Sequence, residues 1–394
     1  MDGNPLSIAL VTETYPPELN GVALTVERAV RYLRDRGHRV DLVRPRQGKE
    51  CTDDALLVRG FPLPRYPELQ FGAPSVLRLL RHWRRERPDV VHIVTEGPLG
   101  WAALLAARQL GVPVSSDYRT HFQRYSGFYR LGGLAGVIGG ALRAFHNRCD
   151  LSFVPTPLLA VELEAEGYRR LACVGRGVDC ALFSPARRSA RLRAEWGVGE
   201  DELVVLHVGR LAPEKNPALA REAFRAIRRE RPEARMVWVG DGPLRAQLEH
   251  EAPDEIFAGV QRGEALAAHY ASADLFLFPS LSETFGNVVT EAMASGLPIV
   301  AFDNGAAHAH LTDQLDARVV PQPQDGLPAA AAGEAFIEAA RLLAGQPQRR
   351  AQFGAAAREA ACRLAWPVVL DRFESRLQML ATSARAYDRA PSAA

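Results

Sequence analysis

The sequence predicts an α/β protein built from two doubly wound, Rossmann-like domains. Short apolar runs alternate with helical patterns along most of the chain, which is typical of stacked strand-helix-strand units and parallel sheets. At 394 residues the chain is longer than one hydrophobic core usually grows. A polar stretch over 183–202, with Pro185 and Gly197 as breakers, interrupts the alternation. We therefore expect one domain over 1–185 and a second over 186–367.

Five short apolar runs in the first half are expected to be strands. Each run is bounded by glycine, proline or charged residues. Longer patterns between the runs repeat with the period of a helix, and two of these are clear. The strands are expected over residues 7–13, 39–45, 89–95, 112–118 and 151–156, and the clear helices over 22–37 and 100–111.

The second half restarts the same alternation. Its strands are expected over residues 202–211, 234–242, 255–260, 274–280 and 298–302. A Pro/Ala/Gly-rich stretch, 321–334, is interpreted as a surface loop. A last helical pattern, about 368–388, could pack on either domain. Open parallel sheets bind ligands at the carboxyl ends of their strands, so two such sheets facing each other across a cleft would bind one substrate each.

The composition favours an ordinary soluble globular protein in a reducing cytosol. Five cysteines, an odd number without a C-x-x-C spacing, argue against a disulfide framework or a structural zinc site. The first residues, MDGNPLSIALVTE, lack the basic start of a signal peptide. No segment approaches 18 unbroken apolar residues, so we expect no membrane span.

Charge is distributed unevenly between the two halves. The first 190 residues carry 26 Lys and Arg against 19 Asp and Glu, and the rest carry 22 against 27. The densest basic segment is 75–89, where Leu80 and Trp83 share a helical face with Leu77, or Trp83 shares one with Leu79. Its arginines could simply cover apolar surface with their stems, or they could contact anionic lipid headgroups. No aromatic platform or known basic motif accompanies them, so nucleic acid is not an expected partner.

Two glutamates eight residues apart raise the question of function most directly. Glu283 lies in a loop after a predicted strand, and Glu291 lies one turn into the following helix. Between them Gly286 permits close backbone approach, and Asn287 begins a helix whose free N–H groups and dipole favour a phosphate. Carboxylates on both sides of a phosphate site suit a sugar, a diphosphate and a ribose in line. The alternative is a capped helix with two incidental acids.

Two other turns offer groups that can hold an anion. Arg210 and Lys215 stand on either side of a Pro-containing bend after the first strand of the second domain, where they could grip neighbouring phosphates. Gly21 precedes a helix at the first turn of the chain, where the helix N-terminus can point at an anion. No G-x-G-x-x-G follows a strand and no P-loop motif exists, which disfavours dinucleotide dehydrogenases and P-loop enzymes.

These motifs together resemble the large fourth family of retaining glycosyltransferases. HVGRLAPEKNP, VGDGP and SETFGNVVTEAMASGLPIVA resemble the family's donor domain, with its E-x7-E motif at Glu283 and Glu291. TETYPPELNGVALTVERAVRYLRDRGHRV resembles the family's N-terminal domain, and DYRTHFQRYSGFY resembles the segment with its active-site histidine. The match extends over nearly the whole chain, in the right order.

The resemblance implies a GT-B fold, with an N-terminal acceptor domain, a C-terminal donor domain and a final helix that crosses back to the first. It places His121 near the anomeric centre of the donor sugar and Gly21 beside the diphosphate. It further implies that Arg210 and Lys215 hold the diphosphate, Glu283 the sugar hydroxyls and Glu291 the ribose, with backbone donors from Phe285, Gly286, Asn287 and Val288.

The same resemblance implies transfer with retention of configuration, in which the leaving phosphate helps to deprotonate the attacking hydroxyl. No D-x-D motif is present and the D-G-P at 241–243 is interpreted as a turn, so we expect no metal and no cofactor. The segment FDNGAAHAHL departs from the family's glycine-rich turn. Its His308 and His310 diverge on a helix and cannot share a metal, so a surface or packing role is expected.

The expected substrates follow from the closest family pattern. DYRTHFQRYSGFYR and FDNGAAHAHL resemble bacterial members that place mannose or glucose on lipids. We therefore expect a hexose to pass from GDP-mannose or a UDP-hexose such as UDP-glucose to a lipid or lipid-linked acceptor, at the inner face of the cell membrane. The alternatives are a soluble saccharide acceptor and, from another class, a non-catalytic scaffold that binds a nucleotide-sugar.

Overall fold

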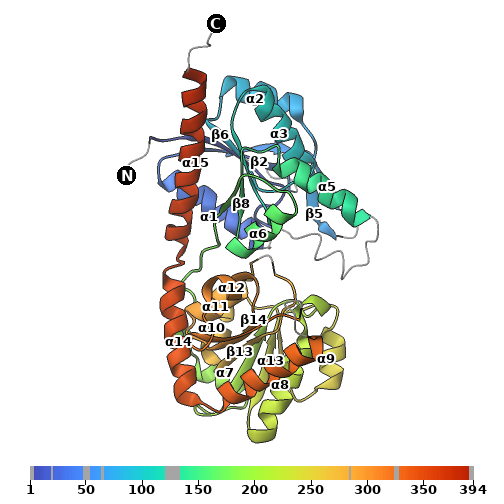
Figure 1. Cartoon of the computed structure of the whole chain (residues 1–394), viewed down its shortest axis with the longest axis vertical. Helices are drawn as coiled ribbons and strands as arrows, with labels where there is room; N and C mark the ends of the chain where they lie inside the picture. Colours follow the sequence, from blue (N-terminus) through green and yellow to red (C-terminus); the bar gives the residue numbers. More distant parts are fainter. Residues whose placement is uncertain are drawn as a thin grey trace. The chain divides into compact units, whose positions relative to one another are not determined.

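The chain folds into two compact units, each built around a parallel sheet (Figure 1). The computed structural model describes residues 4–18, 21–47, 54–63, 66–119, 134–283, 285–323 and 328–389. The first unit comprises Met1–Gly175 with Val369–Ala394, and the second comprises Arg176–Val368. The predicted fold class of two doubly wound domains is therefore confirmed.

The first unit contains a seven-stranded sheet in the order β3-β2-β1-β6-β7-β8-β9, with every pair parallel. Most of its residues are apolar and buried because helices cover both faces of such a sheet. The strands are β1 (Ser7–Val11), β2 (Arg39–Pro45), β3 (Ala55–Val58), β6 (Val90–Ile93), β7 (Val114–Asp117), β8 (Leu151–Val154) and β9 (Leu171–Cys173).

The helices of the first unit are amphipathic or apolar segments between these strands. Side chains from α2, α3 and α5 fill one core together with residues of β1 and β6. A small antiparallel hairpin, β4 with β5, precedes α2 and escaped the sequence analysis. The bounds are α1 (Gly21–Asp35), β4 (Gly60–Leu63), β5 (Tyr66–Gly72), α2 (Val76–Arg85), α3 (Pro98–Gln109), α5 (Leu134–His146) and α6 (Pro157–Ala165).

Helix α2 corrects one detail of the basic segment. Leu79, Leu80 and Trp83 are buried, whereas Leu77 is 68% exposed. The face that includes Leu77 is therefore not the buried one, because contact with α3 selects the other. The arginines between these residues are exposed to solvent.

The last helix, α15 (Trp366–Arg389), begins in the second unit and packs on the first. Glu374 is buried and accepts hydrogen bonds from Arg36 Nε at 3.3 Å and from His38 Nε2 at 2.9 Å. The Phe373 ring packs edge-on against His92, with 4.9 Å between ring centroids. These contacts decide between the two domains on which this helix was expected to pack, and they agree with the crossing helix of the GT-B fold.

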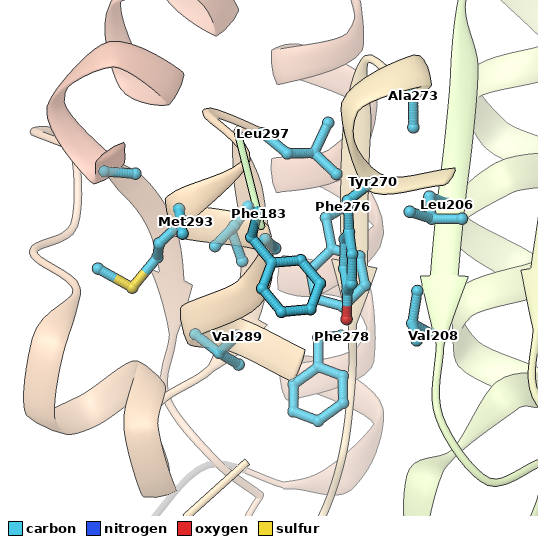
Figure 2. Close-up of a cluster of buried hydrophobic side chains, with 14 of the residues drawn as sticks. Phe183, Leu206, Val208, Tyr270, Ala273, Phe276, Phe278, Val289, Met293 and Leu297 are labelled. Carbon is cyan, nitrogen blue, oxygen red and sulfur yellow. The ribbon is translucent and has the colours of Figure 1, made fainter. Parts of the chain in front are cut away.

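The second unit contains a six-stranded parallel sheet in the order β12-β11-β10-β13-β14-β15. Side chains of α8 and α13 fill the core on one face, and those of α10, α11 and α14 fill the core on the other, part of which is drawn in Figure 2. The strands are β10 (Val204–Val208), β11 (Arg235–Val239), β12 (Ile256–Gly259), β13 (Leu275–Phe278), β14 (Ile299–Phe302) and β15 (Ala317–Val320).

The helices of this unit include one that contradicts the sequence analysis. The stretch 321–334 was expected to be a loop, but α13 begins at Ala329 and its Ala332 is buried. Alanine is the strongest helix former, so the alanine run favours a helix over a turn. The helices are α7 (Ala190–Glu195), α8 (Pro217–Glu230), α9 (Arg245–Glu251), α10 (Gly263–Ser272), α11 (Asn287–Ala294), α12 (Gly305–His310), α13 (Ala329–Ala344) and α14 (Pro347–Cys362).

Candidate active site

The order of strands in the second unit marks where a ligand can bind. From β10 the chain adds β11 and β12 on one side, and then returns to add β13, β14 and β15 on the other. The carboxyl ends of β10 and β13 therefore lie next to each other at the point where the direction reverses. Open α/β sheets bind ligands at such a switch point.

Three loops at this edge are joined by hydrogen bonds. The backbone N–H of Leu281 donates to the carbonyl of Glu214 at 2.9 Å, which joins the loops after β13 and β10. The side-chain amide of Asn304, after β14, donates to the carbonyl of Ser280 at 2.7 Å. The loops are thus fixed to one another by the protein itself, which keeps the site in one arrangement.

Lys215 and Glu283, both predicted from the sequence, form an ion pair across the switch point. Their side chains are only 14% and 8% exposed, so each charge is largely withdrawn from water and depends on polar partners. Lys215 ends a short 3-10 turn, and the next residue, Asn216, takes a left-handed conformation with φ of 51° before α8 begins. This local geometry directs the lysine toward the loop of Glu283.

Arg210 lies on the same loop as Lys215, directly after β10. It is exposed and follows Gly209, whose φ is 155°. A guanidinium on an exposed loop can reach a bound anion with two parallel hydrogen bonds.

Two glycines make the loop of Glu283 possible. Gly286 precedes α11 with a φ of 91°, a conformation that side chains rarely adopt. At Gly305 a Cβ atom would lie 2.5 Å from the carbonyl oxygen of Phe285 and 2.7 Å from the Cβ of Glu283. The segment FDNGAAHAHL lacks the family's full glycine-rich turn, but it keeps glycine at the position where the two loops touch.

The start of α11 offers polar atoms that a ligand could satisfy. Ser282 Oγ and Asn287 Oδ1 are buried and have no hydrogen-bond partner within the described part of the chain. Buried polar atoms in folded proteins are nearly always paired, so such atoms call for an explanation. The first N–H groups of a helix also lack intrahelical acceptors. Val288 packs on the core, while Phe285 is 2% exposed and contributes its backbone rather than its ring to this surface.

Glu291 lies one turn into α11 and is held by a partner that the sequence analysis missed. The hydroxyl of Tyr270, on α10, donates a hydrogen bond of 3.0 Å to Glu291 Oε2. Burial raises the pKa of Glu291 to about 7, although the bond from Tyr270 acts to lower it. The sequence gives one weak signal for Tyr270, a large polar aromatic in the otherwise small-residue stretch YASAD.

The remaining predicted residues lie elsewhere. Gly21 begins α1 in the first unit, where its carbonyl accepts a hydrogen bond of 2.7 Å from Thr25. His121 lies outside the described residues. His308 forms a 2.8 Å hydrogen bond with Asp303, and His310 packs edge-on against Phe285, as expected of surface and packing histidines.

The carboxyl edge of the first sheet holds a second charged cluster that the sequence analysis missed. Asp117 ends β7, is buried, and pairs with Arg119 and with His92 at 3.5 Å. Burial acts to raise the pKa of Asp117, but the interactions with Arg119 and His92 outweigh it and hold the pKa well below its usual range. The sequence signal would have been a buried strand, VPVSSD, that ends in an acid.

Two kinds of feature are absent from the described ranges. Among those residues no three His, Cys, Asp or Glu side chains gather closely enough to hold a metal ion. None of the helices in the same ranges is both long and apolar enough to cross a bilayer.

In comparisons with known proteins, each half of the chain matches a glycosyltransferase family. Residues 19–182 match the family described as Glycosyltransferase Family 4, and residues 202–343 match Glycosyl transferases group 1. The chain is 33% identical to a GDP-mannose-dependent alpha-mannosyltransferase of Mycobacterium tuberculosis, over 92% of this chain and 94% of that protein. It is 26% identical to the alpha-monoglucosyldiacylglycerol synthase of Streptococcus pneumoniae, over 79% of this chain and 74% of that protein.

A solved structure shares the fold. The sucrose-phosphate synthase of Thermosynechococcus elongatus superposes with a TM-score of 0.75 at 20% identity, over 96% of this chain and all of that one. At this identity the likeness concerns the architecture alone.

Proposed function

The chain belongs to glycosyltransferase family 4, and on that premise we propose that it transfers mannose from GDP-mannose to a hydroxyl of a lipid or lipid-linked acceptor, with retention of the α configuration. It is a glycosyltransferase by family membership. The choice of mannose and GDP rests on the 33% identical GDP-mannose-dependent relative, which the chain matches over nearly its full length. The lipid acceptor rests on the glucosyldiacylglycerol synthase relative.

The observation that carries the proposal is the Lys215–Glu283 pair at the switch point of the second sheet. The start of α11 separates Glu283 from Glu291 in the sequence. We propose that donor binding divides this pair. Lys215 and Arg210 then contact the diphosphate, Glu283 accepts hydrogen bonds from the sugar hydroxyls, and the start of α11 faces a phosphate. Glu291 accepts hydrogen bonds from the ribose. The second unit would thus bind the donor and the first unit the acceptor.

Stabilisation of the leaving group would provide most of the catalysis. As the bond to the sugar breaks, negative charge grows on the diphosphate, and preorganised positive groups around it lower the barrier. In the proposed mechanism the phosphate oxygen takes the proton of the acceptor hydroxyl as that hydroxyl attacks from the same face. His121 would lie near the anomeric carbon.

We propose further that this reaction needs no metal ion, because Arg210, Lys215 and the helix start already supply positive charge to the diphosphate. The test is transfer of radiolabelled mannose measured with excess EDTA and, separately, with added Mg²⁺ or Mn²⁺. Equal rates are expected. A rate that vanishes with EDTA and returns with one metal would contradict this part of the proposal.

The test of the main proposal is a transfer assay with paired donors and acceptors. Radiolabelled GDP-mannose and UDP-glucose are each offered with diacylglycerol vesicles, polyprenol phosphate or water-soluble oligosaccharides. We expect label to enter a lipid from GDP-mannose. Transfer from UDP-glucose alone would contradict GDP-mannose as the donor. Transfer to oligosaccharides alone would contradict a lipid as the acceptor. Binding of GDP without transfer to any acceptor would favour a scaffold.

We propose that the first unit also attaches the enzyme to anionic membranes through α2. Its arginines are exposed, and Leu77 beside them is 68% exposed, which suits shallow contact with headgroups. Sedimentation with phosphatidylglycerol vesicles should show binding that weakens with salt. Replacing Arg78 and Arg81 by Glu should abolish it, whereas Arg229→Glu on α8 of the second unit serves as the matched control. Binding that survives the double change would contradict the role of α2.

A further inference from the structure

Tyr270 is a buried residue whose hydroxyl reaches a carboxylate of the proposed donor site. Its exposed fraction is 0%, and its ring belongs to the aromatic core between β10, β13 and α11. Figure 2 shows the ring packed beside Phe183 and Phe276. The hydroxyl donates to Glu291 Oε2 at 3.0 Å.

The surrounding rings leave the hydroxyl little freedom to move. Phe183 meets the Tyr270 ring edge-on at 5.8 Å between centroids, and Phe276 meets it at the same distance. Both residues are themselves buried. In a close-packed interior a ring in such a position has a single rotamer, so the hydroxyl is a fixed reference point for the flexible glutamate.

Apart from His310, the other ionisable groups on the elements that pack against α11 have their own partners. These elements are α10, α12, β14 and α14, and β14 carries no ionisable residue. The groups are Glu264, which pairs with Arg187; His269, which bonds the carbonyl of Ala265; His308, which bonds Asp303; His310, which packs against Phe285 and whose buried Nε2 has no hydrogen-bond partner within the described residues; Arg349, which bonds Gln314; Arg350, which bonds the carbonyl of Ala344; Arg358, which bonds the carbonyls of Phe183 and Ala294; Glu359, which pairs with Arg363; and Cys362, which lies beside Cys180. Among the described residues, Tyr270 is the one side chain whose interaction changes the pKa of Glu291.

A ribose needs this carboxylate ionised and aimed outward. Its hydroxyls donate hydrogen bonds, which an ionised carboxylate accepts with both oxygens and a protonated one accepts less well. Glu291 is half-buried, and Tyr270 bonds only its Oε2, so the other oxygen is the one that a ribose would contact. Burial works against ionisation by raising the pKa of Glu291 to about 7, and the Tyr270 hydrogen bond opposes this effect.

We propose that Tyr270 is a positioning residue for donor binding: its hydroxyl holds one oxygen of Glu291, keeps the carboxylate ionised and directs the other oxygen to the ribose. This inference rests on the proposed function, in which Glu291 receives the ribose. Tyr270 itself does not touch the donor. The sequence separation of 21 residues and the two different helices explain why no local pattern revealed the pair.

The inference predicts that protons compete with the donor. Below a pH of about 7 the free enzyme carries a proton on Glu291, which binding must displace, so affinity for the nucleotide falls as the pH falls. Without the Tyr270 hydroxyl the pKa of Glu291 rises further. The pH at which affinity begins to fall should then move up by about one unit, since a hydrogen bond to a charged group corresponds to one or two pKa units.

The experiment is calorimetric titration with GDP between pH 5.5 and pH 9. For Tyr270→Phe we expect GDP to bind about three- to tenfold more weakly than to the wild type at pH 7, with the gap narrowing toward pH 9. In Glu291→Gln the dependence of affinity on pH below 7 should disappear. The double variant should bind GDP like Glu291→Gln alone, because the hydroxyl then has no carboxylate to hold.

Phe276→Leu is the matched control for packing. It disturbs the same aromatic core without touching the hydrogen bond, so its GDP affinity should follow the pH profile of the wild type even if its melting temperature falls. Should Tyr270→Phe not fold, 3-fluorotyrosine at position 270 tests the same hydrogen bond by strengthening it instead of removing it. Its more acidic hydroxyl should shift the profile to lower pH.

The outcomes separate the two levels of the proposal. If Glu291→Gln weakens GDP binding but the profile of Tyr270→Phe superimposes on that of the wild type, the positioning role is wrong and the proposed function stands. If Glu291→Gln binds GDP as tightly as the wild type at every pH, the donor-site assignment itself is wrong.

Discussion

Glu13 in the first unit and Glu291 in the second share one electrostatic property and differ in everything around it. Burial raises the pKa of each to about 7. Glu13, which follows β1, is 7% exposed, and its Oε1 accepts backbone hydrogen bonds from Leu99 at 3.0 Å and from Gly72 at 3.3 Å. Glu291 is half-buried and has a single side-chain donor on its inner side.

The difference teaches that a shifted pKa does not by itself identify a functional group. Glu13 joins β1, β5 and the start of α3 through donors supplied by the protein, so it acts as a structural link. Glu291 is supplied with one donor and retains open surface, which suits a ligand. The predictions below test this division, from the largest expected effect to the smallest.

Substitutions at the proposed donor site of the second unit should lower activity more than stability. Lys215→Ala is expected to lower kcat/KM for transfer by about a hundredfold to a thousandfold, because in the proposed donor complex it removes a positive group from the leaving diphosphate. Glu13→Gln, which changes the other region, is the control and should retain wild-type kcat/KM. Radiolabelled transfer measures both. Equal losses in the two variants would erase the distinction between the regions.

Glu13 should make folding depend on pH. Its pKa rises from the ordinary 4.5 to about 7 in the folded state, so the folded protein binds more protons than the unfolded chain between these values. The contribution of Glu13 to the free energy of unfolding is therefore highest below pH 4.5. It falls as the pH rises to 7, by up to about 3 kcal/mol.

Glu13→Gln cannot ionise, so its unfolding free energy should vary less between pH 5 and pH 8 than that of the wild type. Urea denaturation at several pH values measures the slope. Because Glu291 shifts in the same direction, Glu291→Gln should also flatten the curve, and only an unchanged slope in both variants would speak against the two pKa shifts.

Removing the Glu13 carboxylate altogether should destabilise the first unit. Glu13→Ala leaves the N–H groups of Gly72 and Leu99 buried without their acceptor, at a cost of about 2 kcal/mol. The melting temperature should fall, while GDP affinity of the folded protein should not change. A matched change in the second unit, Glu291→Ala, is expected to abolish GDP binding. It also leaves the buried Tyr270 hydroxyl without its acceptor, so the loss of GDP binding, and not the melting temperature, distinguishes the two variants.

The smallest expected effect concerns the contact between the two donor loops. Gly305→Ala places a methyl group 2.5 Å from the carbonyl of Phe285, so the loop of Glu283 must shift. GDP affinity should fall about tenfold, which corresponds to roughly 1.4 kcal/mol. Gly37→Ala serves as the control, because nothing lies within 4 Å of its Cβ position, although its φ of 85° adds some strain. Normal GDP binding by Gly305→Ala would indicate that the loop position is not critical.

Site residues that directly follow a strand could be predicted from the sequence. Lys215 and Glu283 were both predicted as site residues because each stands just beyond a strong apolar run, and parallel strands bring such positions to one edge; the ion pair between them was not predicted. The helix start at Asn287 was visible from Gly286 for the same reason. The role of His121 stays a prediction, because this residue lies outside the described part of the chain.

Other features depend on partners that are distant in sequence. Leu77 and Leu79 were equally good candidates for the buried face of α2 until contact with α3 selected one. Tyr270 was not singled out from the sequence, because its hydroxyl bonds Glu291, a residue on another helix. The alanine run of α13 was mistaken for a loop because flanking proline and glycine outweighed the helix preference of alanine.

The measurement that tests the account most directly is GDP titration of three proteins at pH 7.5: wild type, Glu291→Gln and Glu13→Gln. We predict that Glu291→Gln binds GDP at least about tenfold more weakly than the wild type, a difference of roughly 1.4 kcal/mol, and that Glu13→Gln binds it equally well. Undiminished binding by Glu291→Gln, or an equal loss in Glu13→Gln, would contradict the assignment of the donor site to the switch point of the second sheet.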